Sequence, residues 1–187
     1  MADQLDLFRA GPALPEGFRY QPELISPAEE ARLLEEIRAL PFKEFDFHGF
    51  AGKRRVVSFG WRYDFNDRTL QEATEIPPFL RGVRDAAGRF AGLPADALPH
   101  VLVTEYDHAA IGWHRDKPVF GDVVGVSLLS PCTFRLRRKV GAKYERASII
   151  AEPRSAYLLR GPSRTEWEHS IPETDGLRYS ITFRTMR

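Results

Sequence analysis

The segment LRYSITFRTMR (residues 177–187) alternates apolar and polar side chains with the two-residue period of a β-strand. One face carries Leu177, Tyr179, Ile181 and Phe183, and the other carries Arg178, Ser180, Thr182 and Arg184. The pattern predicts a strand with its apolar face in a hydrophobic core. The polar face is either solvated, as on an ordinary amphipathic edge strand, or directed toward a ligand.

The chain before this strand, from His100 onward, is predicted to form further short strands separated by turns. These segments are rich in β-branched or aromatic residues or alternate apolar and polar ones: HVLVTEY (100–106), GDVVGVSLLS (121–130), CTFRLRR (132–138), ERASIIAE (145–152) and SAYLLRG (155–161). RRVVSFGWRYDF (54–65) adds one or two more. We therefore expect an α+β, mainly β fold, a sandwich or barrel with helices packed outside it.

Two helices are expected in the N-terminal half. SPAEEARLLEEIRALPF (26–42) begins with a capping box formed by Ser26 and Glu29, and Pro41 ends the helix. Its apolar positions have helical spacing: Ala31, Leu33, Leu34, Ile37 and Leu40. The second helix is expected over 78–91, with Leu80, Val83, Ala87 and Phe90 on one face. We expect residues 1–25 to be an extended lead-in and 26–187 to form a single domain.

The composition is that of an ordinary globular protein. The chain has 187 residues, a net charge of +1 and one cysteine, which excludes a disulfide framework and a cysteine-rich zinc site. No apolar run is long enough to span a membrane, and the N-terminus does not resemble a signal peptide, so a cytoplasmic monomer is expected. Nine Lys and Arg residues lie between 131 and 165 against two acidic residues, which predicts a local basic face or merely solvated strands.

The segment GWHRDKPVFG (112–121) contains four consecutive residues that can act as catalytic groups or ligands, His114 to Lys117. A kinase catalytic loop is excluded because the required Asn, five residues after the Asp, is Gly121. On a strand, His114 and Asp116 would point to one face, roughly 7 Å apart along the chain. A third ligand is needed, and His169 in WEHSIP, after a predicted strand and before a turn, is the candidate. Two histidines and one carboxylate form the facial triad of non-heme Fe(II) oxygenases.

Arg178 and Arg184 suit the recognition of an anion with two charged ends. Six residues separate them, which places their Cα atoms roughly 20 Å apart on an extended strand, and both side chains can lean inward. Guanidinium groups bind carboxylates in a bidentate manner. The spacing therefore favours a short dicarboxylate.

Together these motifs resemble the AlkB family of Fe(II)- and 2-oxoglutarate-dependent dioxygenases. The similarity includes His114-x-Asp116, the distal His169 and Arg178-x5-Arg184. It extends to GPSRTEWEHSIP (161–172), RYSITFR (178–184) and SLLSPCTFRLRR (127–138), and it covers most of the chain from PEGFRYQPELISPAEE (15–30) onward. The motifs are short, but they occur in the family's order and spacing.

The resemblance implies a fold, a reaction and cofactors. The fold is a double-stranded β-helix, also called a jelly-roll, in which His114, Asp116 and His169 bind Fe(II). Arg178 binds the far carboxylate of 2-oxoglutarate, Arg184 lies nearer the metal, and Tyr106 hydrogen-bonds this co-substrate. Oxidation of an N-methyl group by O₂ and 2-oxoglutarate then releases formaldehyde. Thr104 and Ser180 replace asparagines that the family often has beside the co-substrate.

The resemblance also implies a nucleic-acid partner, with an alkylated base that is single-stranded or flipped out of a duplex. Tyr63 and Phe65 match residues that line the base pocket in the family's DNA-repair members, and Trp61 is a further candidate. Arg54, Arg55 and Arg115 are candidates for contacts with the substrate. One departure concerns base selectivity, because Pro118 replaces a second acidic residue of the best-known repair members.

Three functions remain open from the sequence. The first is demethylation of bases of the 1-methyladenine or 3-methylcytosine type, as in repair of DNA alkylation damage. The second is a dioxygenase of the same fold that acts on tRNA, a protein or a small molecule, which Pro118 and the weak net charge favour. The third is a β-barrel binding module with a structural metal, although such a site is usually closed by four protein ligands, and no fourth is evident.

Overall fold

The computed structural model describes residues 14–47, 50–64 and 69–187. Most of the described chain is arranged in two antiparallel sheets. The larger sheet has seven strands in the order β1 (Phe18–Gln21), β11 (Ala156–Leu159), β8 (Phe120–Leu128), β13 (Arg178–Met186), β6 (His100–Tyr106), β3 (Phe50–Phe59) and β2 (Lys43–Phe47). The smaller sheet has the order β10 (Lys143–Ala151), β9 (Cys132–Val140), β12 (Glu168–Ile171) and β7 (Ile111–His114).

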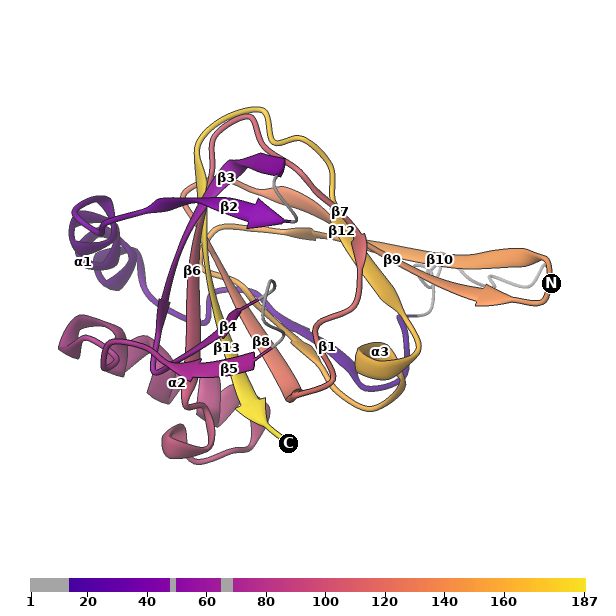
Figure 1. Cartoon of the computed structure of the whole chain (residues 1–187), viewed down its shortest axis with the longest axis horizontal. Helices are drawn as coiled ribbons and strands as arrows, with labels where there is room; N and C mark the ends of the chain where they lie inside the picture. Colours follow the sequence, from indigo (N-terminus) through magenta and orange to yellow (C-terminus); the bar gives the residue numbers. More distant parts are fainter. Residues whose placement is uncertain (1–13, 48–49, 65–68) are drawn as a thin grey trace, which may run out of the picture.

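Short elements complete the fold. A separate hairpin pairs β4 (Trp61–Asp64) with β5 (Thr69–Glu72). The helical elements are α1 (Pro27–Arg38), η1 (Pro78–Leu80), α2 (Arg81–Ala91), η2 (Ala95–Ala97) and α3 (Pro162–Thr165). Figure 1 shows α1 and α2 on one side of the larger sheet, and the long β9–β10 hairpin projecting from the body on the other side. None of these helices is both long and apolar enough to cross a membrane.

Strand β13 lies in the middle of the larger sheet, between β8 and β6. Its apolar residues Tyr179, Ile181 and Phe183 are buried in a cluster with side chains of α1 and α2. Its polar residues face the opposite way, toward the smaller sheet, as the alternation of the sequence predicts. The strand is therefore central rather than an edge strand, and its polar face is directed into the molecule.

A second cluster fills the space between the two sheets. It contains Phe18 and Leu159 from the larger sheet and Phe134, Leu136 and Ile171 from the smaller one. Two sheets facing each other, with helices outside, confirm the mainly β fold expected from the sequence.

The predicted helices form with small differences. Ser26 and Glu29 make both hydrogen bonds of the capping box, and Leu33, Leu34 and Ile37 are buried. Ala31, which was expected on the apolar face, is exposed, whereas its neighbour Glu30 is buried. Glu30 accepts hydrogen bonds from the Leu129 amide at 2.8 Å and the Arg154 guanidinium at 3.2 Å. The helix thus uses one acidic side chain to fix the β8–β9 connection.

Part of the expected extended lead-in belongs to the larger sheet. Residues 18–21 form β1, which pairs with β11. Residues 1–13 lie outside the described residues.

Candidate metal centre and co-substrate site

Two histidines meet across neighbouring strands of the smaller sheet. His114 ends β7 and His169 lies in β12, and the register of these antiparallel strands pairs the two residues directly. Their ring centres are 4.2 Å apart. The sequence had suggested that His169 follows a strand and precedes a turn. It lies within a strand instead, and this pairing is what brings it to His114.

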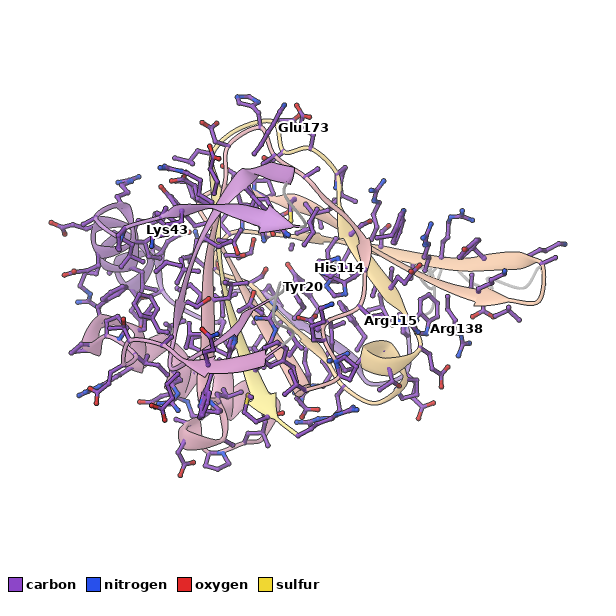
Figure 2. All side chains as sticks on the ribbon, viewed as in Figure 1. Tyr20, Lys43, His114, Arg115, Arg138 and Glu173 are labelled. Carbon is purple, nitrogen blue, oxygen red and sulfur yellow. The ribbon has the colours of Figure 1, made fainter. Side chains whose placement is uncertain are left out.

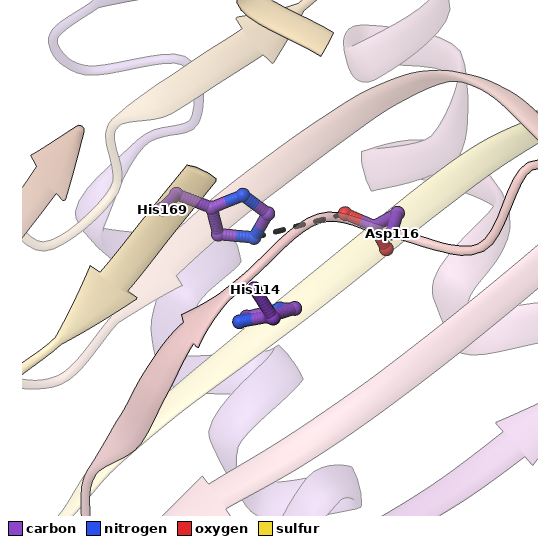
Figure 3. Close-up of side chains that lie close together, drawn as sticks. All are labelled: His114, Asp116 and His169. Carbon is purple, nitrogen blue, oxygen red and sulfur yellow. Dashed lines mark ion pairs between the residues drawn. The ribbon is translucent and has the colours of Figure 1, made fainter. Parts of the chain in front are cut away.

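Asp116 completes a group of three possible metal ligands. It lies beyond the end of β7 and not on the strand, so the predicted two-residue strand geometry is wrong for Asp116. Its Oδ2 nevertheless lies 3.7 Å from His169 Nε2. One ligand atom from each of His114, Asp116 and His169 lies within 4.8 Å of the other two. Figure 3 shows the three side chains converging from the strand β12 and the end of β7.

The charge states of these residues suit a divalent cation. Burial lowers the pKa of His169 to about 3, and burial also lowers the pKa of His114. Burial would raise the pKa of the Asp116 carboxyl, but the Arg184 guanidinium and the two imidazoles bring it well below its usual range. At neutral pH the three groups are therefore a carboxylate and two neutral imidazoles, which are the forms that bind metals.

The tautomer of His114 is set by the backbone. Its Nδ1 lies 2.8 Å from the carbonyl oxygen of Gly112, which only accepts hydrogen bonds, so Nδ1 carries the proton. Nε2 then keeps a free lone pair. A hydrogen bond on the other ring nitrogen is the usual way in which proteins orient a ligating histidine.

Arg184 holds Asp116 in place. Its Nε and Nη2 lie 2.7 and 2.6 Å from Oδ1 of the carboxylate. Its Nη1 lies 3.4 Å from Nδ1 of the buried His100, and its guanidinium lies over the Phe120 ring at 5.0 Å. Arg184 thus leaves Oδ2 as the free oxygen of Asp116. Arg184, which was predicted to lie nearer the metal than Arg178, thus contacts the candidate ligand Asp116 directly.

Arg164 fixes the loop that follows Asp116. This buried residue of α3 donates hydrogen bonds to the carbonyl oxygens of Lys117, Phe120 and Gly121, at 2.8, 2.8 and 2.9 Å. A guanidinium that satisfies three carbonyl groups of one loop restricts its backbone strongly. The sequence does not predict this role of Arg164, because nothing in the spacing of GPSRTEWEHSIP reveals a loop more than forty residues earlier in the chain.

Arg178 is a buried cation without a carboxylate partner in the described part of the chain. It is 0% exposed. Its Nε and Nη2 lie 3.3 and 3.1 Å from Ser127 Oγ, and its guanidinium lies 5.0 Å from the centre of the Tyr106 ring. Its Nη1 has no hydrogen-bond partner among the described residues. Because a buried charge is costly unless paired, this geometry fits a carboxylate ligand beside Tyr106.

A narrow cavity connects these groups. Thr104 and Ser180, which face each other across β6 and β13, both contribute to its wall, as does Tyr106. The full lining is Arg54, Leu102, Thr104, Tyr106, Ile111, His114, Asp116, Val123, Phe134, Tyr157, His169, Ile171, Ser180, Thr182 and Arg184. The residues predicted to surround a co-substrate therefore lie in one cavity with the three candidate ligands.

Tyr157 is a lining residue that the sequence did not single out. It lies on β11 directly opposite Gly125 of β8, and its ring is tilted against that of Phe134, with ring centres 4.3 Å apart. Burial raises the pKa of its hydroxyl, and Tyr106 lines the same cavity. The segment SAYLLRG reads as an ordinary buried strand, and only the register reveals that this tyrosine faces the cavity.

Gly125 makes room for the Tyr157 ring. A Cβ atom at position 125 would overlap the Tyr157 phenol at Cζ and the hydroxyl oxygen. We expect Gly125→Ala to destabilise the chain by about 1–3 kcal/mol, as overpacking does, and to weaken 2-oxoglutarate binding by displacing the phenol. Thermal unfolding and co-substrate titration check this. The variant Gly125→Ala/Tyr157→Val should regain most of the stability, and if it does not, the overlap is not the cause.

The candidate substrate contacts are in different surroundings. Arg54 lines the cavity and hydrogen-bonds Tyr106, so its predicted contact with the substrate stays a prediction. Arg55 forms an ion pair with Glu105 at 2.6 Å. Arg115 lies outside the cavity lining and donates to the carbonyl oxygen of Thr165 at 3.2 Å. Arg55 and Arg115 therefore already have partners within the chain.

The predicted aromatic residues of the base pocket lie in or beside the β4–β5 hairpin. Trp61 begins β4 and is half-buried. Tyr63 is in the same strand, but its side chain lies outside the described part, and Phe65 lies outside the described residues altogether. Their assignment to the base pocket stays a prediction.

The observed donors fit Fe(II) and 2-oxoglutarate. Three buried side-chain atoms lack a hydrogen-bond partner within the described residues: Asp116 Oδ2, Arg178 Nη1 and Arg154 Nε. The first two are chemically complementary to these two groups, because Asp116 Oδ2 suits a cation and Arg178 Nη1 suits a carboxylate. Two histidines and one carboxylate leave coordination positions open for a co-substrate and O₂, as in non-heme iron oxygenases. A zinc site of purely structural character is closed by four protein ligands, and the group holds three.

Similarity to known proteins agrees with this chemistry. Residues 17–184 match the 2OG-Fe(II) oxygenase superfamily. Over 193 residues the chain is 27% identical to the protein "Alkylated DNA repair protein ALKBH8 homolog" of Arabidopsis thaliana. This match covers 89% of the chain but only 54% of the relative, so the chain spans about half the length of that protein.

The solved structure of OsALKBH1 has the same fold. It matches with a TM-score of 0.68 at 17% identity, over 92% of this chain and 98% of that one. The expected double-stranded β-helix is thereby confirmed. The family match, the His-Asp-His group and the shared fold lead to one assignment: the chain is a dioxygenase that uses Fe(II), 2-oxoglutarate and O₂, it belongs to the 2OG-Fe(II) oxygenase superfamily, and it is similar to AlkB-type proteins.

Proposed function

We propose that this dioxygenase removes alkyl groups oxidatively from N-alkylated bases of nucleic acid, of the 1-methyladenine or 3-methylcytosine type. The observation that carries the proposal is the combination of the group His114, Asp116 and His169, which line one cavity, with a relative named for the repair of alkylated DNA. Family membership supplies the oxidation chemistry. The relative supplies the class of substrate.

In this proposal His114, Asp116 and His169 hold Fe(II), and 2-oxoglutarate binds beside them. The metal, with this co-substrate and O₂, supplies the oxidising power for hydroxylation of an N-alkyl carbon. Arg178 and Tyr106 bind the distal carboxylate, with Thr104 and Ser180 along the wall of the cavity. Arg184 keeps the Asp116 carboxylate ionised and oriented.

The burial of the site restricts which nucleic-acid bases can reach the candidate ligands. His169 is 8% exposed, and the side chain of Asp116 is 5% exposed. A base that is stacked in a duplex cannot reach groups at this depth, so the alkylated base enters single-stranded or flipped out. The hydroxylated alkyl group then leaves as an aldehyde, which requires no further catalytic residue.

Mass spectrometry of modified oligonucleotides tests this function. Single-stranded DNA and RNA that carry one 3-methylcytosine or 1-methyladenine are incubated with the protein, Fe(II), ascorbate and 2-oxoglutarate. We expect the oligonucleotide to lose the mass of one CH₂ unit only with the wild-type chain and 2-oxoglutarate, and not with His114→Ala.

Other outcomes of that experiment separate the alternatives. Succinate formed without loss of mass would reject demethylation of these bases. It would leave a dioxygenase for tRNA, a protein or a small molecule, the function that Pro118 favours. Bound metal with neither loss of mass nor succinate would contradict dioxygenase turnover and would favour the binding module with a structural metal.

A further inference from the structure

The outer face of the smaller sheet carries a continuous row of alternating arginine and aromatic side chains. Trp113 of β7 lies between Arg135 and Arg137 of β9, whose guanidinium carbons are 5.0 and 4.5 Å from its ring centre. Arg137 also lies 4.8 Å from the Tyr144 ring of β10, and Arg146 lies 5.5 Å from the same ring. We call these five residues the arginine–aromatic row.

The pairing of the strands explains why these residues meet. Arg137 is the cross-strand partner of both Arg146 on β10 and Glu168 on β12. Side chains alternate along a strand, so these residues share the face opposite to Phe134 and Leu136, which are buried between the sheets. The row therefore runs across the sheet from its edge strand β7 to its other edge strand β10.

The row carries positive charge that the rest of the described chain only partly neutralises. Arg137 is paired with Glu168 at 2.6 Å. Arg135 donates instead to the hydroxyl of Ser170 at 3.0 Å, and Arg146 forms no ion pair with a described residue. Lys139, which shares this face because side chains alternate along β9, adds one exposed cation near the tip of the hairpin. Four basic residues of the run noted in the sequence, Arg135, Arg137, Lys139 and Arg146, therefore lie on a surface that also offers aromatic rings.

The row begins one residue from a predicted metal ligand. Trp113 precedes His114 on β7, and the two side chains point to opposite faces of this strand. Because β7 is an edge strand of its sheet, a chain that crosses this edge passes from the metal cavity to the row. Figure 2 shows His114 in the interior, and Figure 1 shows the β9–β10 hairpin extending from there away from the body.

We infer that the arginine–aromatic row binds the single-stranded nucleic acid that flanks the base in the active site. Single strands bind to proteins through grooves or faces that pair cations with phosphates and stack bases on aromatic rings. Guanidinium planes both stack and bind phosphate oxygens. An acidic peptide matches the charge but leaves Trp113 and Tyr144 without stacking partners, so the row favours a polynucleotide. This inference rests on the proposed function for its class of substrate.

The outer end of the row is suited to a test, because Tyr144 is 39% exposed and Arg146 is exposed. The experiment measures fluorescence anisotropy of a labelled, unmodified single-stranded oligonucleotide with the full chain, at several salt concentrations. The variants are Tyr144→Leu and Arg146→Gln. The matched control is Arg81→Gln, which removes an equal charge from an exposed position of α2, on the helical side of the larger sheet.

We expect Tyr144→Leu to weaken binding by about fivefold or more, the effect of losing one stacked base. Arg146→Gln should weaken binding and lower the salt slope of the affinity by about 0.7, the effect of one lost phosphate contact on a single strand. Arg81→Gln should bind as the wild type does, and all three variants should keep the melting temperature.

The inference is overturned if the wild-type chain binds no oligonucleotide, or if the row variants bind as tightly as Arg81→Gln does. The experiments distinguish failure of this inference from failure of the proposed function. Row-dependent binding without demethylation would reject the proposed function alone. Demethylation by a chain whose oligonucleotide affinity is unchanged by Tyr144→Leu and Arg146→Gln would reject only the inference about the arginine–aromatic row.

Discussion

Asp116→Asn should abolish metal binding and turnover together. Asparagine keeps the size of the side chain but removes the negative charge that two neutral imidazoles cannot replace. It also leaves Arg184 buried without its carboxylate, and loss of one partner from a buried pair typically costs about 3–5 kcal/mol. We therefore expect both stoichiometric Fe(II) binding and the melting temperature to fall.

Anaerobic titration with Fe(II), with thermal unfolding in parallel, measures these two effects. The control is Asp96→Asn, which alters an exposed aspartate of η2 and should change neither quantity. A second variant separates metal binding from folding. His169→Gln removes a ligand but leaves the Asp116–Arg184 pair intact, so it should lose metal binding with a smaller loss of stability. Retention of full Fe(II) affinity by both variants would disprove the metal centre.

Arg178→Met should lose 2-oxoglutarate binding but keep the metal. Two hydrogen bonds from a charged group to the distal carboxylate, at about 1.5 kcal/mol each, correspond to a rise of about 100-fold or more in the apparent KM for 2-oxoglutarate. Unlike most substitutions of buried residues, Arg178→Met should not lower the free energy of unfolding. In the protein without its co-substrate, Arg178 is a buried charge with no carboxylate partner among the described residues. Its replacement by a hydrophobic side chain should therefore be neutral or stabilising.

Thermal unfolding with and without 2-oxoglutarate measures both parts of this prediction. The co-substrate should raise the melting temperature of the wild type, because it binds only the folded chain, and it should leave Arg178→Met unchanged. The control variant is Arg89→Met, at an exposed position in the last turn of α2. An Arg178→Met variant that responds to 2-oxoglutarate as the wild type does would show that the carboxylate binds elsewhere.

The sequence predicted the parts of the fold that depend on local patterns. The two faces of β13, the capping box at Ser26 and the strand β6 over 100–106 all follow from residue type and period, and all are observed. The three candidate ligands were identified from chemistry and spacing. Their geometry was not predictable in detail, because it depends on the pairing of β7 with β12 and on a loop that places Asp116 outside the strand.

Residues whose role depends on partners distant in the sequence could not be identified. Tyr157 faces the cavity because β11 pairs with β8, and Gly125 is the residue opposite it. Arg55 was predicted to contact substrate because it is basic and follows Arg54. Its ion pair with Glu105 depends on the register of β3 and β6, which the sequence alone does not specify.

The loop held by Arg164 has a consequence for how the protein folds. Its three hydrogen bonds close loops of 43 to 47 residues, and they join the segment after Asp116 to the helix that directly precedes His169. Contacts of such sequence separation form slowly, because the entropy of closing the loop is lost before the contact stabilises the chain. The metal centre should therefore assemble late in folding, after the β9–β10 hairpin, whose strands are connected by a short turn. In a newly made chain, His169 would reach the other two ligands in the same step in which Arg164 forms its hydrogen bonds to the loop after Asp116.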